Sequence, residues 1–199
     1  LKSRCEEVPV EVSVESDAGG APRTRTVCTP AAEAVVVPLD VYGIPWFAFT
    51  GPDNTPAELP GAWLASVSDT RDAVNALGLP IILALTPLGE AFDGLAAEAN
   101  QQSGTLVLND KWKPVCYDPS QDGNPTKWRD AYAGYVKWAV EYFDAQWVYL
   151  AQRVNLNERI CGSQVYQSIL EFAEAAHARL QELEAPPVSV VTVDVEDLY

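Results

Sequence analysis

The sequence has no methionine, one histidine, and only 13 basic residues against 28 acidic ones. The net charge of −15 argues against nucleic acid or an anionic membrane as a partner, because both attract basic surfaces. No uncharged run is long enough to cross a membrane. Since the chain starts at Leu1 and contains no methionine, we expect it to be a processed product or part of a longer one.

Cysteine is also scarce, and the four present are Cys5, Cys28, Cys116 and Cys161. They form no Cys-x-x-Cys pair and no cluster with the single His177, so we expect no metal site and no cofactor. Four cysteines fit either reduced, buried thiols in the cytosol or two disulfides in an oxidising compartment. We favour the two disulfides, and therefore an extracellular or secreted protein.

Apolar residues are abundant, at 48% of the chain, which is enough for one sizeable core. Residues 1–30 predict a separate β-hairpin, because valines alternate with polar residues over 8–15 and Asp-Ala-Gly-Gly at 17–20 supplies a turn. Cys5 and Cys28 lie near the open end of this hairpin, where a disulfide would close it. Its valine face needs a cover, since an isolated hairpin is marginally stable.

Residues 31–199 predict a second domain in which apolar strands alternate with helices. We expect strands at 34–40, 80–86, 147–153 and 188–193, and helices at 68–77, 126–143 and 164–183. Right-handed crossovers between such elements build a parallel sheet, so the predicted fold class is α/β. A long loop, 89–125, follows the second strand, and ordered loops of that length are often functional.

The long loop contains Cys116, and the loop after the third strand contains Cys161. The carboxyl ends of neighbouring parallel strands lie at the same end of a sheet. We therefore predict a disulfide between Cys116 and Cys161 that restrains the long loop, which leaves Cys5 to pair with Cys28.

Four stretches of the chain fit one known pattern when they are taken in order: VVVPLDVYGIPW, PIILALTPL, YAGYVKWAVEYFDAQWVYLAQRVNL and VSVVTVDVEDL. Together they resemble the second to fifth strands of a secreted (β/α)8 glycoside-hydrolase-like family, over roughly residues 33–199. The resemblance implies a TIM-type barrel, partial or degenerate here, with the N-terminal hairpin in place of the first strand and helix. Four strands do not close a barrel, which takes about 250 residues, so the domain at 31–199 is expected to be incomplete.

In this family a strand ending in Glu-Val-Asn supplies the general-acid candidate. The glutamate position holds Arg153 here, followed by Val154 and Asn155. An arginine cannot donate and recover a proton near neutral pH, because its pKa is far too high. The second carboxylate that glycoside hydrolysis needs would come from a later strand. We therefore expect the chain by itself to be inactive on glycosides and assign it no catalytic residue.

Three functions remain open, and the two non-catalytic ones come first. A glycan-binding protein would stack sugar rings on Trp46 and Trp63 and bind sugar hydroxyls through Asp40, Arg153 and Asn155, although both tryptophans fit core packing equally well. A structural assembly subunit would instead use exposed strand edges and an unpaired sheet face to bind other protein chains, either copies of itself or different ones.

The third function is a fragment or half of an active TIM-barrel glycoside hydrolase. Its carboxylates would be Asp40, Asp93 and Glu196, which lie at or beyond strand ends but more simply fit solvated loop acids in a very acidic chain. The expected partners are thus other protein chains that complete the sheet, with polysaccharide as a further candidate.

Overall fold

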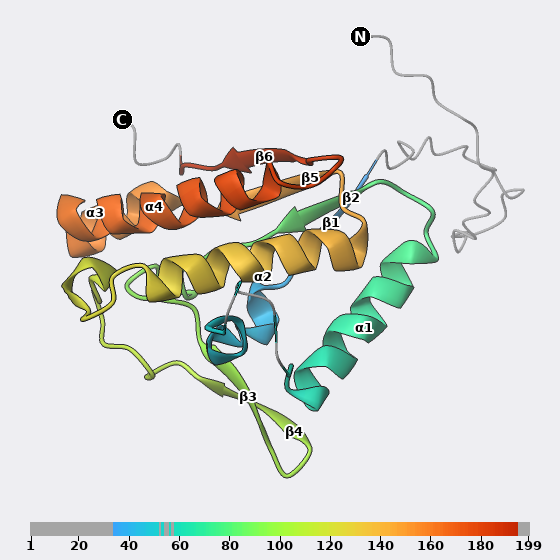
Figure 1. The fold of residues 1–199 in the computed structure, drawn as a ribbon, viewed down its shortest axis with the longest axis horizontal. Helices are drawn as coiled ribbons and strands as arrows, with labels where there is room; N and C mark the ends of the chain where they lie inside the picture. The colour runs from blue at the N-terminus through green and yellow to red at the C-terminus, as the bar shows by residue number, and fades with distance from the viewer. Residues whose placement is uncertain (1–33, 52, 54–55, 57, 195–199) are drawn as a thin grey trace, which may run out of the picture. The chain divides into compact units, whose positions relative to one another are not determined.

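A four-stranded parallel sheet organises the chain (Figure 1). The structure is a computed structural model that describes residues 34–51, 53, 56 and 58–194. The predicted hairpin, its Cys5–Cys28 disulfide and Glu196 lie outside these residues. The strands of the sheet are β1 (Val35–Pro38), β2 (Ile81–Ala84), β5 (Trp147–Ala151) and β6 (Val188–Val191).

The four strands lie in the order β1-β2-β5-β6, and every neighbouring pair is parallel. The predicted α/β class and parallel sheet are therefore confirmed. All four strands begin within one residue of the predicted starts and end two residues early, because the last predicted residues of each run leave the ladder. A parallel sheet whose strands lie in the order of the sequence can be an open sheet or part of a barrel, so the TIM-type barrel stays a prediction.

Helices connect the strands and cover one side of the sheet (Figure 1). They are α1 (Gly61–Asn75), α2 (Lys127–Phe143), α3 (Val154–Cys161) and α4 (Ser163–Leu180). The predicted start of the first helix at Ser68 is wrong by seven residues. The helix begins early because the side chain of Gln101, from a distant strand, accepts the backbone N–H of Ala62 at 2.8 Å.

Two elements occur where the sequence predicts only loop. The hairpin β3 (Glu98–Gln102) and β4 (Thr105–Asn109) interrupts the long loop, and Ser103 and Gly104 both adopt positive φ in its turn. Helix α3 replaces the loop expected before Gly162. Short 3₁₀ turns complete the fold: η1 (Asp40–Tyr42), η2 (Trp46–Phe49) and η4 (Pro119–Gln121).

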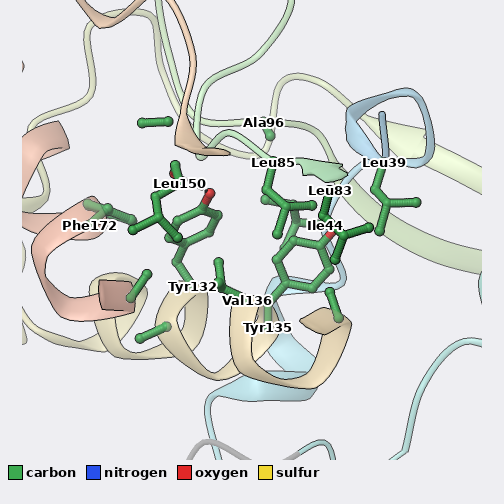
Figure 2. Close-up of a cluster of buried hydrophobic side chains, with 14 of the residues drawn as sticks. Leu39, Ile44, Leu83, Leu85, Ala96, Tyr132, Tyr135, Val136, Leu150 and Phe172 are labelled. Atoms are coloured by element: carbon green, nitrogen blue, oxygen red, sulfur yellow. Dashed lines mark hydrogen bonds between the residues drawn. The ribbon is translucent and has the colours of Figure 1, made fainter. Parts of the chain in front are cut away.

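The core lies between the sheet and α2, as Figure 2 shows. Tyr132, Tyr135 and Val136 point from α2 toward Leu83 and Leu150 of the sheet. The Tyr132 hydroxyl donates to the backbone carbonyl of Leu150 at 2.6 Å, so this buried polar group keeps a partner. The aromatic stripe predicted for α2 is thus core packing, as expected.

The other side of the sheet carries apolar side chains that stay accessible. The hydroxyl of Ser189 hydrogen-bonds His177 of α4 at 2.7 Å, so Ser189 points to the helices and its strand neighbours point the opposite way. Val188 and Val190 are in register with the outward residues of the other strands. We call this surface the open face, and its members are Val36, Pro38, Ile82, Trp147, Tyr149, Val188 and Val190.

Candidate functional site

Four residues join the carboxyl ends of β5 and β6 in one hydrogen-bonded group, the strand-end network of Arg153, Asn155, Thr192 and Asp194. The Arg153 guanidinium forms an ion pair with the Asp194 carboxylate, with Nε at 2.9 Å, and its backbone N–H donates to the Thr192 hydroxyl at 3.1 Å. The Asn155 amide donates to the Asp194 carbonyl at 2.9 Å and accepts the Asp194 N–H at 2.7 Å. Both predicted site residues of this strand are therefore brought together.

Arg153 caps the start of α3 with a φ of 51°, and its half-exposed guanidinium lies 5.2 Å from the centre of the Phe92 ring. The Asp194 carboxylate beside it holds the Arg153 guanidinium in place through a charge-assisted hydrogen bond. Position 153 thus holds a cation paired with Asp194. This group can position a strand end and a helix start, and it can donate hydrogen bonds, but it contains no proton donor suited to neutral pH.

Asp40 lies apart from this network. It is an exposed residue in the first 3₁₀ turn, after the edge strand β1, and its carboxylate accepts the backbone N–H of Val41 at 3.0 Å. Strand β2 separates β1 from β5 in the sheet. Asp40 and Arg153 are therefore not members of one contact group.

Trp46 and Trp63 are both fully buried. The Trp46 indole donates to the carbonyl of Ala96 at 2.9 Å, and the Trp63 indole donates to the carbonyl of Gly43 at 3.3 Å. Each ring also packs against aromatic neighbours. The core-packing alternative accounts for both tryptophans, and neither ring offers a face on which a sugar could stack.

A cleft of about 480 Å³ lies where η2 meets β3. Its wall includes Glu98, whose side chain is buried, together with Glu58, Asn100 and the ring of Phe47. Sequence reasoning missed Glu98 because the residue was assigned to a loop. Glu98 begins the segment Glu-Ala-Asn-Gln-Gln, which is otherwise uncharged and carries no signal of burial.

Burial raises the pKa of Glu98 to about 7, although backbone N–H groups of Trp46 and Phe47 favour its charged form. The Trp46 N–H donates to the Glu98 carboxylate at 3.0 Å. A carboxyl that titrates near neutral pH beside a cleft can bind, donate or accept a proton there. Glu98 therefore links the η2 turn to β3 through a hydrogen bond, and its carboxyl can gain or lose a proton near neutral pH.

Phe47 gives the cleft an accessible aromatic surface. Its ring is 55% exposed, and its edge-to-face partners Trp128 and Trp112 hold it at centroid distances of 5.2 and 5.9 Å. The ammonium of Lys113 lies over the Trp128 ring at 4.8 Å and pairs with Asp122 at 3.2 Å. The aromatic surface beside the cleft is thus rigidly supported.

The predicted disulfide between Cys116 and Cys161 is confirmed. It links the long loop to the end of α3, and the amide of Asn157 in α3 donates to the carbonyl of Phe92 in the same loop at 2.8 Å. Asp93, the residue after Phe92, is half-buried, and its backbone carbonyl accepts the N–H of Cys116. Asp93 is therefore part of a braced loop and lies outside the strand-end network.

Within the described part of the chain, no three His, Cys, Asp or Glu side chains form a group suited to a metal ion. No helix in that part is both long and apolar enough to cross a membrane.

No protein-family model, no curated protein and no solved structure matches this chain. The proposals that follow therefore depend on the geometry of the described residues.

Proposed function

We propose that this chain is a non-catalytic, glycoside-hydrolase-like protein of the extracellular space that acts as a structural subunit and binds another polypeptide across the open face. The observation that carries this proposal is the open face itself, on which Val36, Trp147, Val188 and Val190 are between 39 and 57% exposed. An apolar patch of about 300 to 600 Å² on a protein surface is often functional, and a partner chain would remove it from water. The Cys116–Cys161 disulfide is compatible with the extracellular setting.

The ion pair between Arg153 and Asp194 supports the non-catalytic part of the proposal. Replacement of the acid by a paired cation removes the proton donor on which glycoside hydrolysis depends. We expect the purified chain to release no reducing sugar from a panel of β-linked and α-linked oligosaccharides. We expect the same of Arg153→Glu. The new carboxylate would lie beside that of Asp194, whereas glycoside hydrolysis needs two carboxylates that flank the scissile bond. Turnover by either protein would contradict the non-catalytic assignment.

Molar mass and the fluorescence of a hydrophobic dye test the structural part. If another polypeptide covers the open face, the purified chain is an oligomer. If the partner is absent from the preparation, the chain is a monomer that binds the dye through Trp147 and its neighbours. A monomer that binds no dye would refute the proposal, because the face would then have no need of a partner.

Glycan binding is the second candidate function, and the cleft beside Glu98 favours it. An accessible aromatic ring next to carboxylate and amide groups, here Phe47 with Glu58, Glu98 and Asn100, matches the two faces of a sugar. Titration calorimetry with soluble oligosaccharides tests this function. Phe47→Ala should abolish binding, whereas Val41→Ala, a change at another exposed apolar residue nearby, should leave it unchanged. Equal binding by both variants would exclude the cleft as the glycan site.

The cleft also keeps the active hydrolase as the remaining alternative, since Glu58 and Glu98 are two carboxylates in one cleft. Turnover that is lost in Glu98→Gln and retained in Arg153→Ala would favour it.

A further inference from the structure

We propose that the polypeptide on the open face is a second copy of this chain, and that two copies close one eight-stranded parallel barrel in which β6 of each copy pairs with β1 of the other. This inference rests on the proposed function, because it names the partner that binds the open face.

Strand number and order provide the first argument. The sheet has four parallel strands in sequential order, with the helices on one side. A closed (β/α) barrel has eight such strands, with all helices outside and apolar side chains inside. A twofold axis along the barrel would place eight strands in one continuous order and would create two identical junctions. Closed twofold symmetry is also the commonest arrangement of protein oligomers.

The two sheet edges provide the second argument. The N–H of Val35 donates to the carbonyl of Pro80, just before β2, and the N–H of Leu39, just after β1, donates to that of Ala84. The alternation of a parallel ladder therefore directs the N–H of Val36 outward. Pro38 has no N–H, so at this last position of β1 the strand offers a partner only its carbonyl, and a junction formed there would lack one ladder hydrogen bond. In β6, Val188 and Thr192 donate toward β5.

The same alternation directs the N–H groups of Ser189 and Val191 away from β5. Each copy therefore has a β6 edge with outward donors and a β1 edge with outward carbonyls. Two such edges complement each other in a parallel pair, and both pairs form at once in the twofold arrangement.

Area and charge provide the third argument. Val36, Trp147, Val188 and Val190 are 52, 39, 57 and 40% exposed. Tryptophan covers up to about 250 Å² and valine no more than the roughly 150 Å² of the smallest aromatic side chains, so these fractions leave at most on the order of 350 Å² to water. A standard interface takes about 800 Å² per partner, so the four side chains supply nearly half and the two edge junctions must supply the rest.

The open face contains no charged residue. The chain carries a net charge of −15, so two copies repel each other wherever charged surfaces approach. An uncharged face is the surface through which two such copies can associate with the least repulsion. A basic partner would instead require acidic groups on the face, and none of the seven members provides one.

Sedimentation velocity of the 199-residue chain over a concentration series tests the inference. We expect a reversible species of twice 21.6 kDa. Val188→Lys should raise the dissociation constant of the dimer at least tenfold, because it places a charge inside the closed barrel. The matched control is Val115→Lys, at a valine that is 68% exposed in the long loop, and it should leave the constant unchanged.

A second variant distinguishes the closed barrel from two sheets stacked face to face. Val191→Pro removes an outward N–H from the β6 edge and should abolish the dimer, whereas Val191→Ala shortens the same side chain, keeps the N–H and should retain the dimer. Circular dichroism and thermal unfolding establish that each variant is folded. Should Val191→Pro fail to fold, Val36→Pro removes the outward donor of the opposite edge and is expected to have the same effect.

A dimer that is weakened by Val188→Lys but unaffected by both proline variants would overturn the closed barrel. An assembly larger than a dimer would overturn the twofold closure. A monomer that binds the hydrophobic dye would overturn this inference and leave the proposed function standing, and a monomer that binds no dye would overturn both.

Discussion

The ionisation of the single buried residue Glu98 makes the stability of the folded protein depend on pH. Burial raises the pKa of Glu98 from 4.5 to about 7, so the folded state holds a proton that the unfolded state has already released between those values. The contribution of Glu98 to the free energy of unfolding therefore decreases as the pH rises from about 4.5 to 7, and it is constant above that. The full effect is at most about 3.5 kcal/mol, since one pKa unit corresponds to about 1.4 kcal/mol.

We predict that Glu98→Gln removes this part of the pH dependence. The free energy of unfolding, measured with denaturant at pH 5, 6, 7 and 8, should decrease less steeply in the variant than in the unchanged protein. Glu90→Gln, at an exposed glutamate of the loop after β2, is the control and should follow the unchanged protein. Parallel curves for Glu98→Gln and the unchanged protein would show that Glu98 is ionised at low pH in the fold.

The turn from η1 to η2 leads into the 3₁₀ turn that contains Trp46 and lines one side of the cleft. Gly43 adopts a φ of 64°, and a Cβ at this position would lie 2.7 Å from the carbonyl oxygen of Ala97. The next residue, Ile44, donates to that same carbonyl at 2.9 Å and accepts the N–H of Ala99 at 2.9 Å. The turn is thus joined to β3 as closely as a paired strand, and glycine is required by both the conformation and the contact.

We predict that Gly43→Ala is much more destabilising than Gly104→Ala. Both glycines have positive φ, but an added Cβ at Gly104 meets no atom within 4 Å. Strain alone should cost about 1 kcal/mol at Gly104, and the clash with backbone should bring the cost at Gly43 above about 2 kcal/mol. Chemical denaturation of both variants measures the difference. Equal losses would mean that β3 shifts to accommodate the methyl group.

The Cys116–Cys161 disulfide stabilises two elements together, the long loop and α3. Its cysteines are separated by 45 residues, for which the restriction of the unfolded chain predicts about 4 kcal/mol as an upper value. We predict that the double variant Cys116→Ser/Cys161→Ser loses about 2 to 4 kcal/mol under oxidising conditions. Hydrogen exchange should accelerate in α3 and remain unchanged in α1. Uniform acceleration in both helices would indicate global unfolding in place of local release.

At the scale of the whole molecule, the charge of −15 opposes any association between copies. Salt screens charges over about 10 Å at 0.1 M and about 3 Å at 1 M. We predict that the dimer dissociation constant decreases as sodium chloride rises from about 0.05 to 0.5 M, measured by sedimentation at fixed pH. A basic partner would give the opposite dependence, because salt weakens the attraction of unlike charges. A constant that increases with salt would therefore contradict association between two copies.

The four strands of the parallel sheet and helices α2 and α4 could be predicted from local sequence, whereas the β3–β4 hairpin, helix α3 and the start of α1 could not. The α2 stripe and the apolar strands have periods that the backbone geometry dictates. The start of α1 depends on Gln101, and the start of α3 depends on Thr192, whose carbonyl accepts the N–H of Val154 at 3.2 Å. Both partners lie far away in the sequence, so no local signal marks either helix start.

The candidate site likewise contains residues whose positions the sequence could predict and residues whose positions it could not. Arg153 and Asn155 follow a predicted strand, and their position at its end could be anticipated. Their partner Asp194 reaches them only because β6 lies beside β5. Glu98 could not be anticipated, since its burial results from the turn that lies against β3.

Residue identity and the period of each segment were enough to predict the α/β class, the parallel sheet, the Cys116–Cys161 pairing and the arginine at the end of the third strand. The packing of the folded chain was needed to establish that Trp46 and Trp63 are buried, that Glu98 lines a cleft and that Val188 and its neighbours are exposed. Burial depends on which distant surfaces meet, and that information lies in the packing of the whole chain and in no single segment of it.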